Sequence, residues 1–179
     1  MLSGCGINEV VDRDEDVKAA WAEVQNQYQR RADLVPNLVS VVKGAANFEQ
    51  QTLTAVTEAR ASVGSMKVDA SILDDPNRFR QFEQAQQQLS SALSRLLVVS
   101  ENYPDLKASA AFRDLMVQLE GTENRIAVAR QRFNLAVAEY NKVVQRFPTM
   151  IGAMIRGKNV RPTFEAHTPG AERAPEVKF

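Results

Sequence analysis

Hydrophobic residues recur every seven positions between residues 112 and 147, and this spacing predicts one long helix. The positions on its apolar face are Phe112, Leu119, Ile126, Phe133, Tyr140 and Phe147, with Met116, Val137 and Val144 each four residues after one of them. Such spacing gathers the side chains into one stripe along a helix. A helix of about 40 residues is about 60 Å long, so we expect other helices to pack alongside it and cover the stripe.

A first helix is predicted over residues 9–44. Acidic side chains cluster over residues 9–16, where they favour the positive end of a helix dipole. The inward positions are Val10, Val17, Trp21, Val24, Tyr28, Arg31, Val35, Leu38, Val42 and Ala45, with Asp14 as a polar exception. The hydrophobic phase continues past Pro36, so we expect the helix to bend there rather than to break.

Two shorter helices are predicted between these long ones. Asn47 and Gln50 resemble a capping box at the start of the second helix, which then continues to Gly64. Asp75 followed by Pro76 is a typical start for the third helix, because the carboxylate can cap it and proline suits its first turn. The regular inward positions of the third helix are Phe79, Phe82, Gln86, Leu89, Leu93, Leu96 and Ser100.

The predicted fold is all-α, an antiparallel up-and-down four-helix bundle with long helices and an irregular C-terminal tail. The bundle domain covers residues 9–156, after a short N-terminal segment of residues 1–8. The tail, residues 157–179, is rich in proline, and Phe164, Val177 and Phe179 could pack it onto the bundle. An alternative is that the first two helices are continuous through Gly44, which would give three long helices.

Composition argues against several classes of function. Lys and Arg together number 22, as do Asp and Glu, so the chain has no excess of positive charge to bind nucleic acid. His167 is the single histidine and Cys5 the single cysteine, and no cluster with metal-ligand spacing accompanies them. We therefore expect no metal, no cofactor and no catalytic residue, and hence a protein that is not an enzyme.

Charged residues at stripe positions are the most informative polar groups. Arg31 interrupts the stripe of the first helix, while Glu123 and Arg130 interrupt that of the last. If these helices run antiparallel, Arg31 and Glu123 can meet across the bundle, directly or through Asn37 or Asn124. Such a polar layer has two interpretations: it can fix the register of the helices, or it can line a binding cleft.

Leu2, Ser3 and Gly4 before Cys5 resemble a bacterial lipobox, in which the cysteine thiol carries the lipid. The charged and apolar segments of a signal peptide do not precede it, so the chain would begin inside a precursor. A frayed terminus with an unmodified thiol is the alternative. Gly6 rather than Asp follows the cysteine, which in a Gram-negative host would indicate an outer-membrane lipoprotein facing the periplasm.

Four blocks of sequence resemble the bacterial LemA family. They are Gln29-Arg30-Arg31-Ala32-Asp33-Leu34-Val35-Pro36-Asn37-Leu38-Val39, Thr57-Glu58-Ala59-Arg60-Ala61, Tyr103-Pro104-Asp105-Leu106-Lys107 and Gln118-Leu119-Glu120-Gly121-Thr122-Glu123-Asn124-Arg125-Ile126. The resemblance covers residues 9–165 and implies a helical bundle held at a membrane, with that part outside the cytoplasm and no established enzymatic activity. Many members begin with a transmembrane segment, whereas this chain resembles the subset with a lipoprotein signal.

The residues and the family resemblance together leave three alternative functions. The first is a membrane-anchored interaction or scaffold protein of the cell envelope, with other envelope proteins as partners. The second is a small-ligand, peptide or enzymatic site in a polar cleft between the first and last helices. Its candidate residues are Arg30, Arg31, Asp33, Asn37, Glu120, Glu123, Asn124 and Arg130. The third is a partner of a membrane protease, which the resemblance permits but no residue indicates.

Overall fold

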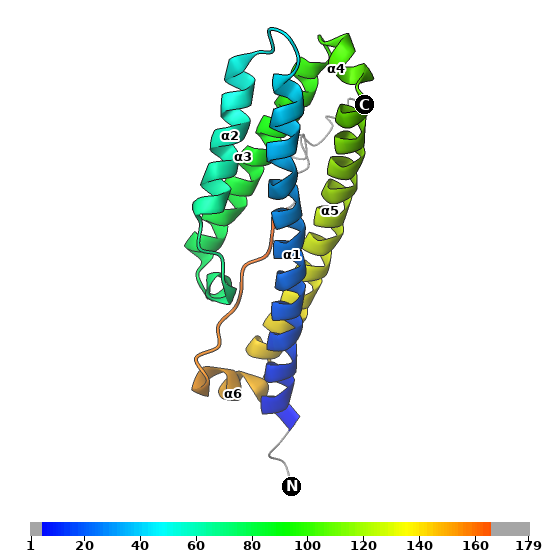
Figure 1. Ribbon diagram of the computed structural model, residues 1–179. Helices are drawn as coiled ribbons and strands as arrows, with labels where there is room; N and C mark the ends of the chain where they lie inside the picture. Colours follow the sequence, from blue (N-terminus) through cyan, green and yellow to red (C-terminus); the bar gives the residue numbers. More distant parts are fainter. Residues whose placement is uncertain (1–4, 166–179) are drawn as a thin grey trace, which may run out of the picture.

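The computed structural model describes residues 5–165, and all regular structure in this part of the chain is helical (Figure 1). The elements are α1 (Cys5–Lys43), α2 (Gln50–Ser65), the 3₁₀ helix η1 (Ala70–Asp74), α3 (Pro76–Ser100), α4 (Pro104–Ala108), α5 (Ala110–Gln145) and α6 (Thr149–Ile155). The all-α prediction is confirmed. The four predicted helices correspond to α1, α2, α3 and α5.

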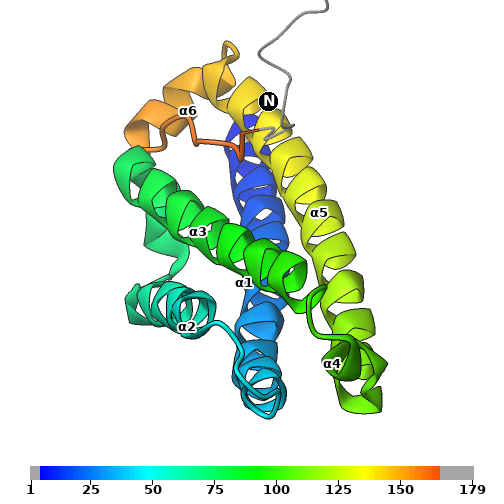
Figure 2. The same ribbon diagram turned by 90° about the horizontal axis from the view of Figure 1, so that it is seen from above.

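The long helices lie in two antiparallel pairs. α1 and α5 run side by side and make the most extensive contact between any two elements, and α2 packs mainly on α3. Figure 2 shows the axis of α3 inclined to those of α1 and α5. The short α4 joins α3 to α5 at one end of the molecule, whereas α6 packs against the start of α1 and the end of α5 at the other.

Helix α1 passes through Pro36 without interruption and ends at Lys43, as its hydrophobic phase predicted. The helix is therefore not fused to α2, and the three-helix alternative is wrong. Its start differs from the prediction, because α1 begins at Cys5 rather than at residue 9. The acidic cluster consequently follows the first turn instead of forming it.

The two predicted helix starts had different outcomes. Asp75 caps α3 as expected, since its Oδ1 accepts hydrogen bonds from the backbone N–H groups of Asn77 (3.0 Å) and Arg78 (3.2 Å). The capping box at Asn47 is wrong. Asn47 has φ of +59°, a left-handed turn conformation, and α2 begins three residues later, at Gln50, without a side-chain cap.

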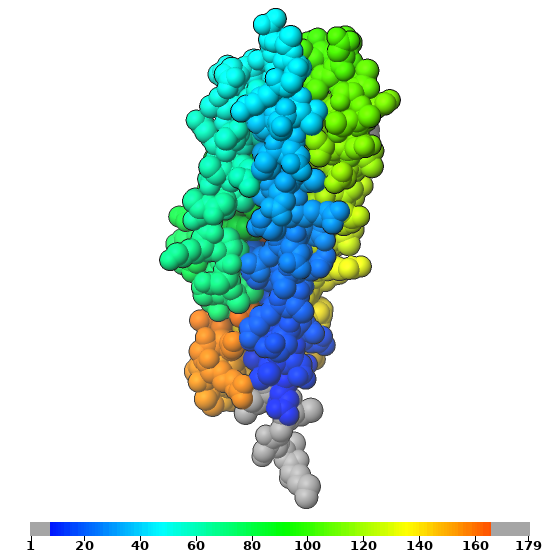
Figure 3. All heavy atoms as spheres, viewed as in Figure 1, coloured from blue at the N-terminus to red at the C-terminus, as the bar shows by residue number. Residues whose placement is uncertain are grey.

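The buried apolar residues form two clusters along the length of the molecule. An aromatic core contains Trp21, Tyr28, Phe79, Phe82, Phe133, Tyr140 and Phe164, together with Val10, Val17, Ile126, Val137 and Ala153. An aliphatic core contains Val35, Leu38, Val42, Leu53, Val56, Leu89, Leu93, Leu96, Leu106, Phe112 and Leu119. The elongated surface in Figure 3 encloses both cores, and Arg31 lies on α1 between them.

Phe147 departs from the prediction for the last long helix, whereas Phe164 packs on the bundle as predicted. Phe147 was predicted to continue the apolar stripe, but α5 ends at Gln145 and Phe147 is 73% exposed. Phe164 lies beyond the last helix and yet is buried, with its ring against Trp21, Phe79 and Phe133. Residues 158–165 therefore form a strap that packs onto the helices. Within residues 5–165, no helix is both long enough and apolar enough to cross a membrane.

Candidate functional site

Arg31 is the centre of a polar layer that joins three helices. Its side chain is 1% exposed, and Nη1 donates to Oγ of Ser90 on α3 (2.6 Å) and to Oε1 of Glu123 on α5 (3.1 Å). Nη2 donates to the backbone carbonyl (2.9 Å) and to Oε1 (2.7 Å) of Gln86, one turn earlier on α3. The guanidinium also lies over the Tyr28 ring, 5.1 Å from its centroid. The expected contact between Arg31 and Glu123 is therefore present.

The surroundings of this contact differ from the expected ones. The Glu123 side chain is 44% exposed, so the ion pair has one buried end and one end at the surface. The buried neighbour on α5 is Thr122, whose hydroxyl donates to the Gln118 carbonyl (2.8 Å). Neither Asn37 nor Asn124 takes part in the hydrogen bonds of Arg31, which are donated to Gln86, Ser90 and Glu123.

The remaining candidate residues do not converge on one cleft. Arg30, Asp33, Asn37, Glu120 and Asn124 are exposed. Asp33 accepts a hydrogen bond from Gln29 on the same helix (2.8 Å). Arg130 belongs to a separate group, because its Nη2 contacts Glu83 Oε1 (3.4 Å) and donates to the Glu165 carbonyl (3.0 Å).

A second buried ionic cluster lies at the α6 end of the molecule. Asp14, the polar exception in the first stripe, is 5% exposed and forms ion pairs with Arg161 (2.6 Å), Lys158 (3.0 Å) and Lys18 (3.1 Å). Burial alone would raise the pKa of Asp14, but the hydrogen bonds from Lys158 and Lys18 and the charge of Arg161 outweigh it and lower that pKa. Asp14 therefore remains ionised at neutral pH.

Arg161 connects this cluster to the aromatic core. Its Nε donates to Asp74 Oδ1 (2.9 Å), and its guanidinium lies 4.6 Å from the centroid of the Tyr140 ring. Burial raises the pKa of Tyr140, so the hydroxyl stays protonated. The sequence marked Asp14 as unusual but gave no sign of Arg161 as its partner, because the partner lies on the irregular strap.

Two asparagines on α5 hold the strap by its backbone. Asn141 Nδ2 donates to the Arg161 carbonyl (3.0 Å) while its Oδ1 accepts from the Arg161 N–H (2.9 Å). Asn134 makes the same pair of bonds with Phe164, at 3.0 and 2.9 Å. Glu83 adds a bond from the Glu165 N–H (3.0 Å). Asn134 and Asn141 are seven residues apart on α5, a spacing that could have revealed a polar face there.

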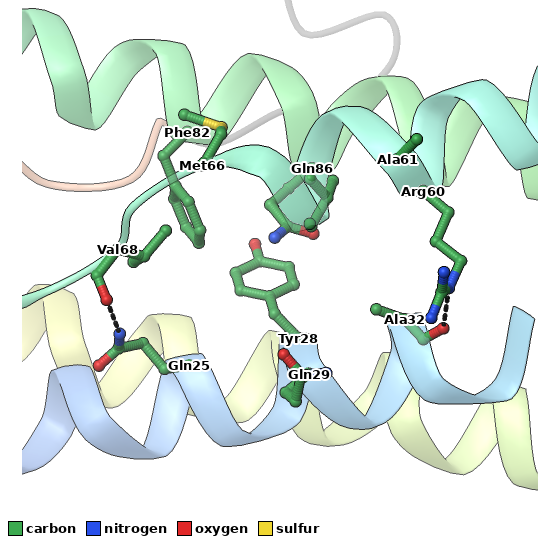
Figure 4. A pocket seen from close by; sticks show the side chains of 12 residues that line it. Gln25, Tyr28, Gln29, Ala32, Arg60, Ala61, Met66, Val68, Phe82 and Gln86 are labelled. Carbon is green, nitrogen blue, oxygen red and sulfur yellow. Dashed lines mark hydrogen bonds between the residues drawn. The ribbon is translucent and has the colours of Figure 1, made fainter.

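A groove of about 460 Å³ lies between α1, α2 and α3 (Figure 4). Tyr28 points from α1 toward Gln86, and burial raises the pKa of its hydroxyl. Gln25 donates to the Val68 carbonyl (3.1 Å) at one end, and Arg60 donates to the Ala32 carbonyl (3.0 Å) at the other. The polar groups along this groove are thus largely engaged with the protein itself.

Two smaller grooves contain the exposed candidates. Glu120 and Glu123 line one of about 390 Å³ between α3 and α5, together with Ser90, Leu93 and Met116. Asn124 lines another, of about 320 Å³, with residues of α1 and α5. The polar layer therefore lies between two grooves, because Gln86 lines the groove of about 460 Å³ and Ser90 lines the groove that contains Glu120. Within residues 5–165, no three histidine, cysteine or acidic side chains are placed to hold a metal ion.

Comparison with known proteins gives relatives of modest identity. The magnetosome protein MamQ of Magnetospirillum gryphiswaldense is 28% identical over 166 residues, covering 84% of this chain and 61% of the relative. The protein LemA of Metamycoplasma hominis is 24% identical over 142 residues, covering 79% of this chain and 61% of the relative. The chain thus spans less than two thirds of the length of these curated relatives.

The family assignment rests on a longer match. The model of the LemA family matches residues 20–179. This range includes the polar layer, the aliphatic core, most of the aromatic core and the strap. The sequence blocks that suggested the family thus lie within a match that covers most of the chain, and the chain belongs to the LemA family.

Proposed function

We propose that this protein is a membrane-associated protein of the bacterial cell envelope that acts as an interaction or scaffold module and not as an enzyme. The observation that carries the proposal is the enclosure of Arg31, whose guanidinium binds Gln86, Ser90 and Glu123 on two other helices. A buried charge whose hydrogen bonds are all made to neighbouring helices holds those helices in register. We also interpret the two antiparallel pairs as an up-and-down four-helix bundle.

Family membership supports the location. The LemA resemblance implies a helical part held at a membrane, and the relatives named magnetosome proteins fit a protein that works within a larger cellular structure. In a Gram-negative host, the proposed place is the outer membrane, with the helices facing the periplasm. The partners would be other envelope proteins, and a membrane protease is one candidate among them.

The proposed anchor is a lipid on Cys5, whose side chain lies outside the described residues. Mass spectrometry of protein from its source should find a lipid-modified N-terminal cysteine. Cys5→Ala should leave the helices folded, as judged by circular dichroism, and move the protein from the membrane fraction to the soluble fraction. An unmodified cysteine in membrane-extracted protein would refute the anchor.

Site-specific crosslinking from intact membranes tests the interaction role. A photoreactive residue at Asn37 or Asn124, both exposed on the long helices, should trap the same envelope protein in repeated experiments. The same residue at buried Leu38 serves as the control and should trap none. If the exposed probes trap only lipid or nothing, while the protein is folded and membrane-bound, the scaffold proposal fails.

A binding site for a small ligand or peptide is the second candidate function. The observation that favours it is the groove of about 390 Å³, where Glu120 and Glu123 lie beside the apolar side chains of Leu93 and Met116. Glu120, an exposed carboxylate beside this apolar floor, suits a cationic ligand or a basic peptide, while Glu123 is already paired with Arg31. Binding of such peptides, measured by calorimetry, should fall in Glu120→Gln and remain in Asp114→Gln, which changes an exposed acid on the same helix outside this groove.

A further inference from the structure

Large exposed apolar side chains gather at the α6 end of the molecule. They are Phe147, Met150, Ile151, Met154, Ile155 and Val160, of which Phe147, Met154 and Ile155 are 73–79% exposed. We name this set the apolar cap. The opposite side of α6 is fixed to the protein, because Ala153 is buried in the aromatic core and Thr149 donates hydrogen bonds to carbonyls at the end of α5. The cap is therefore held outward by a packed helix.

The cap lies beside the first turns of α1. α6 packs on both α1 and α5, and Figures 1 and 3 show it next to the start of α1, which begins at Cys5. The grooves described above are lined by other residues, so the cap is a separate surface. Exposed apolar side chains gathered at one end of a protein mark an interaction site.

We propose that the apolar cap inserts into the outer part of a lipid bilayer and holds the long helices at a fixed orientation to the membrane. Apolar side chains on a short interfacial helix bind by leaving water for the headgroup and acyl boundary. The proposal rests on the proposed membrane association in one respect: an anchor at Cys5 would bring the neighbouring cap to the bilayer surface and raise its effective concentration there.

The same geometry argues against an end-to-end dimer as the occupant. Two copies joined end to end through their caps would direct the starts of their α1 helices toward each other, so both anchors could not lie in one leaflet. A bilayer accepts this end of every anchored copy without that conflict.

Charge near the cap predicts how binding depends on lipid type. Arg146 and Arg156 flank the cap, whereas the adjacent turns of α1 expose Glu9 and Asp12. Since these charges oppose one another, attraction to anionic lipid should add little to apolar insertion. Adding phosphatidylglycerol to phosphatidylcholine vesicles, or adding salt, should change binding by less than about threefold.

Co-flotation of the full unlipidated chain with vesicles tests the proposal. The triple variant Phe147→Ser, Met154→Ser, Ile155→Ser should bind phosphatidylcholine vesicles at least about tenfold more weakly than the unchanged chain. The matched control Val98→Ser, Val117→Ser, Leu135→Ser changes side chains that are 62–69% exposed on α3 and α5 and should bind as the unchanged chain does. Circular dichroism should give the same helix content for all three proteins.

A fluorescence measurement identifies the inserted residues. With Cys5→Ser as background, a polarity-sensitive dye at Met154→Cys should shift to the blue when vesicles are added, and the same dye at Val117→Cys should not. Equal vesicle binding by both triple variants overturns the proposal. Absence of binding by the unchanged chain also overturns it, whether the chain is monomeric or forms a cap-dependent dimer in sedimentation. Because these proteins carry no lipid, such a failure leaves the separate test of Cys5 lipidation standing.

Discussion

Arg31 shows how one buried cation can connect three helices. Its four hydrogen bonds reach two residues on α3 and one on α5, so removing it leaves several acceptors with weaker partners. Glu123, by contrast, is 44% exposed and can exchange the ion pair for water. The two ends of this pair should therefore differ greatly in their contribution to stability.

Arg31→Met is expected to lower the free energy of unfolding by about 3–5 kcal/mol, as for a buried ion pair that loses one partner. Glu123→Gln should cost about 1 kcal/mol or less, as for a surface pair. Chemical denaturation of both single variants and of the double variant measures these values and their coupling. Arg30→Met is the matched control, since Arg30 is the exposed neighbour and should change stability little. Equal effects at positions 30 and 31 would contradict the assigned role of the polar layer.

Asp14 makes stability depend on pH in acid. Its pKa is lower in the folded protein than the ordinary value of 3.8, so the unfolded chain binds a proton more readily. The stabilisation is therefore complete above about pH 4 to 5 and is lost as the pH falls through the folded pKa. Asp14→Asn should reduce stability by about 3 kcal/mol at pH 7.

The difference between Asp14→Asn and the unchanged protein should shrink as the pH is lowered below 3.8, because Asp14 is then protonated in the unfolded chain and, at lower pH, also in the folded protein. Thermal unfolding at several pH values measures this convergence. Asp12→Asn is the control, because Asp12 is exposed on the same helix and should give a small, nearly constant difference. A constant large gap for Asp14→Asn down to acid pH would show that its charge is not the cause.

At the level of elements, the strap differs most from its description as an irregular tail, because it is part of the packed core. Two asparagine side chains on α5 bind its backbone, and Phe164 fills a place among four core aromatic rings. The strap thus contributes to the aromatic core although it has no regular secondary structure. Its removal should resemble the loss of a core residue.

Phe164→Ala is expected to cost about 3–5 kcal/mol because it leaves a cavity among aromatic side chains. Phe147→Ala, which changes an exposed phenylalanine, should cost less than about 1 kcal/mol. Deleting residues 166–179, which lie outside the described part, should cost only a few kcal/mol, at about 2 kcal/mol for each large apolar side chain that it contains. Calorimetric melting of the three proteins gives the order, and a cost of Phe164→Ala no greater than that of Phe147→Ala would contradict the core position of Phe164.

The helix stripes were predictable because α1, α3 and α5 are long enough for the 3.6-residue period to dominate. Every predicted inward position on α3 is buried, Gln86 and Ser100 included. The stripe on α5 was less accurate in its second series, because Thr122 and Ala129, three residues after seam positions, are more buried than Glu123 and Arg130. A straight α-helix drifts relative to a strict seven-residue repeat, so a seven-residue pattern does not identify the buried residues at the edges of the stripe.

The strap and its ionic cluster could not be predicted in the same way. An extended segment with proline has no period to indicate which residue points inward, and the path of residues 158–165 depends on helices already assembled. The sequence indicated that Asp14 occupies an inward position, but it did not indicate that Arg161 is the partner of Asp14. In the candidate site, the contact between Arg31 and Glu123 could be predicted from the sequence. The other two acceptors, Gln86 and Ser90, could not, because their positions depend on how α3 is inclined to α1 and α5.

At the scale of the whole molecule, α1 and α5 contribute to both cores, whereas α2 contributes buried apolar residues only to the aliphatic core. The polar layer lies between these cores. α2 buries only Thr52, Leu53 and Val56 and packs mainly on α3. Elements with few buried contacts open locally at a free-energy cost below that of global unfolding, so α2 should be the long helix that opens most easily.

Hydrogen exchange measured by mass spectrometry should show this order. Amides in the middle of α2 should exchange at least about tenfold faster than those of α1 between Val17 and Val42, which would correspond to an opening free energy lower by about 1.4 kcal/mol. Leu53→Ala should speed exchange further in α2 and in the α3 surface beneath it, while leaving the aromatic core around Trp21 nearly unchanged. If exchange in α2 and α1 proceeds at one common rate in both proteins, the two cores unfold as a single unit. In that case the polar layer at Arg31 couples them, and Arg31→Met should then be the substitution that separates the rates.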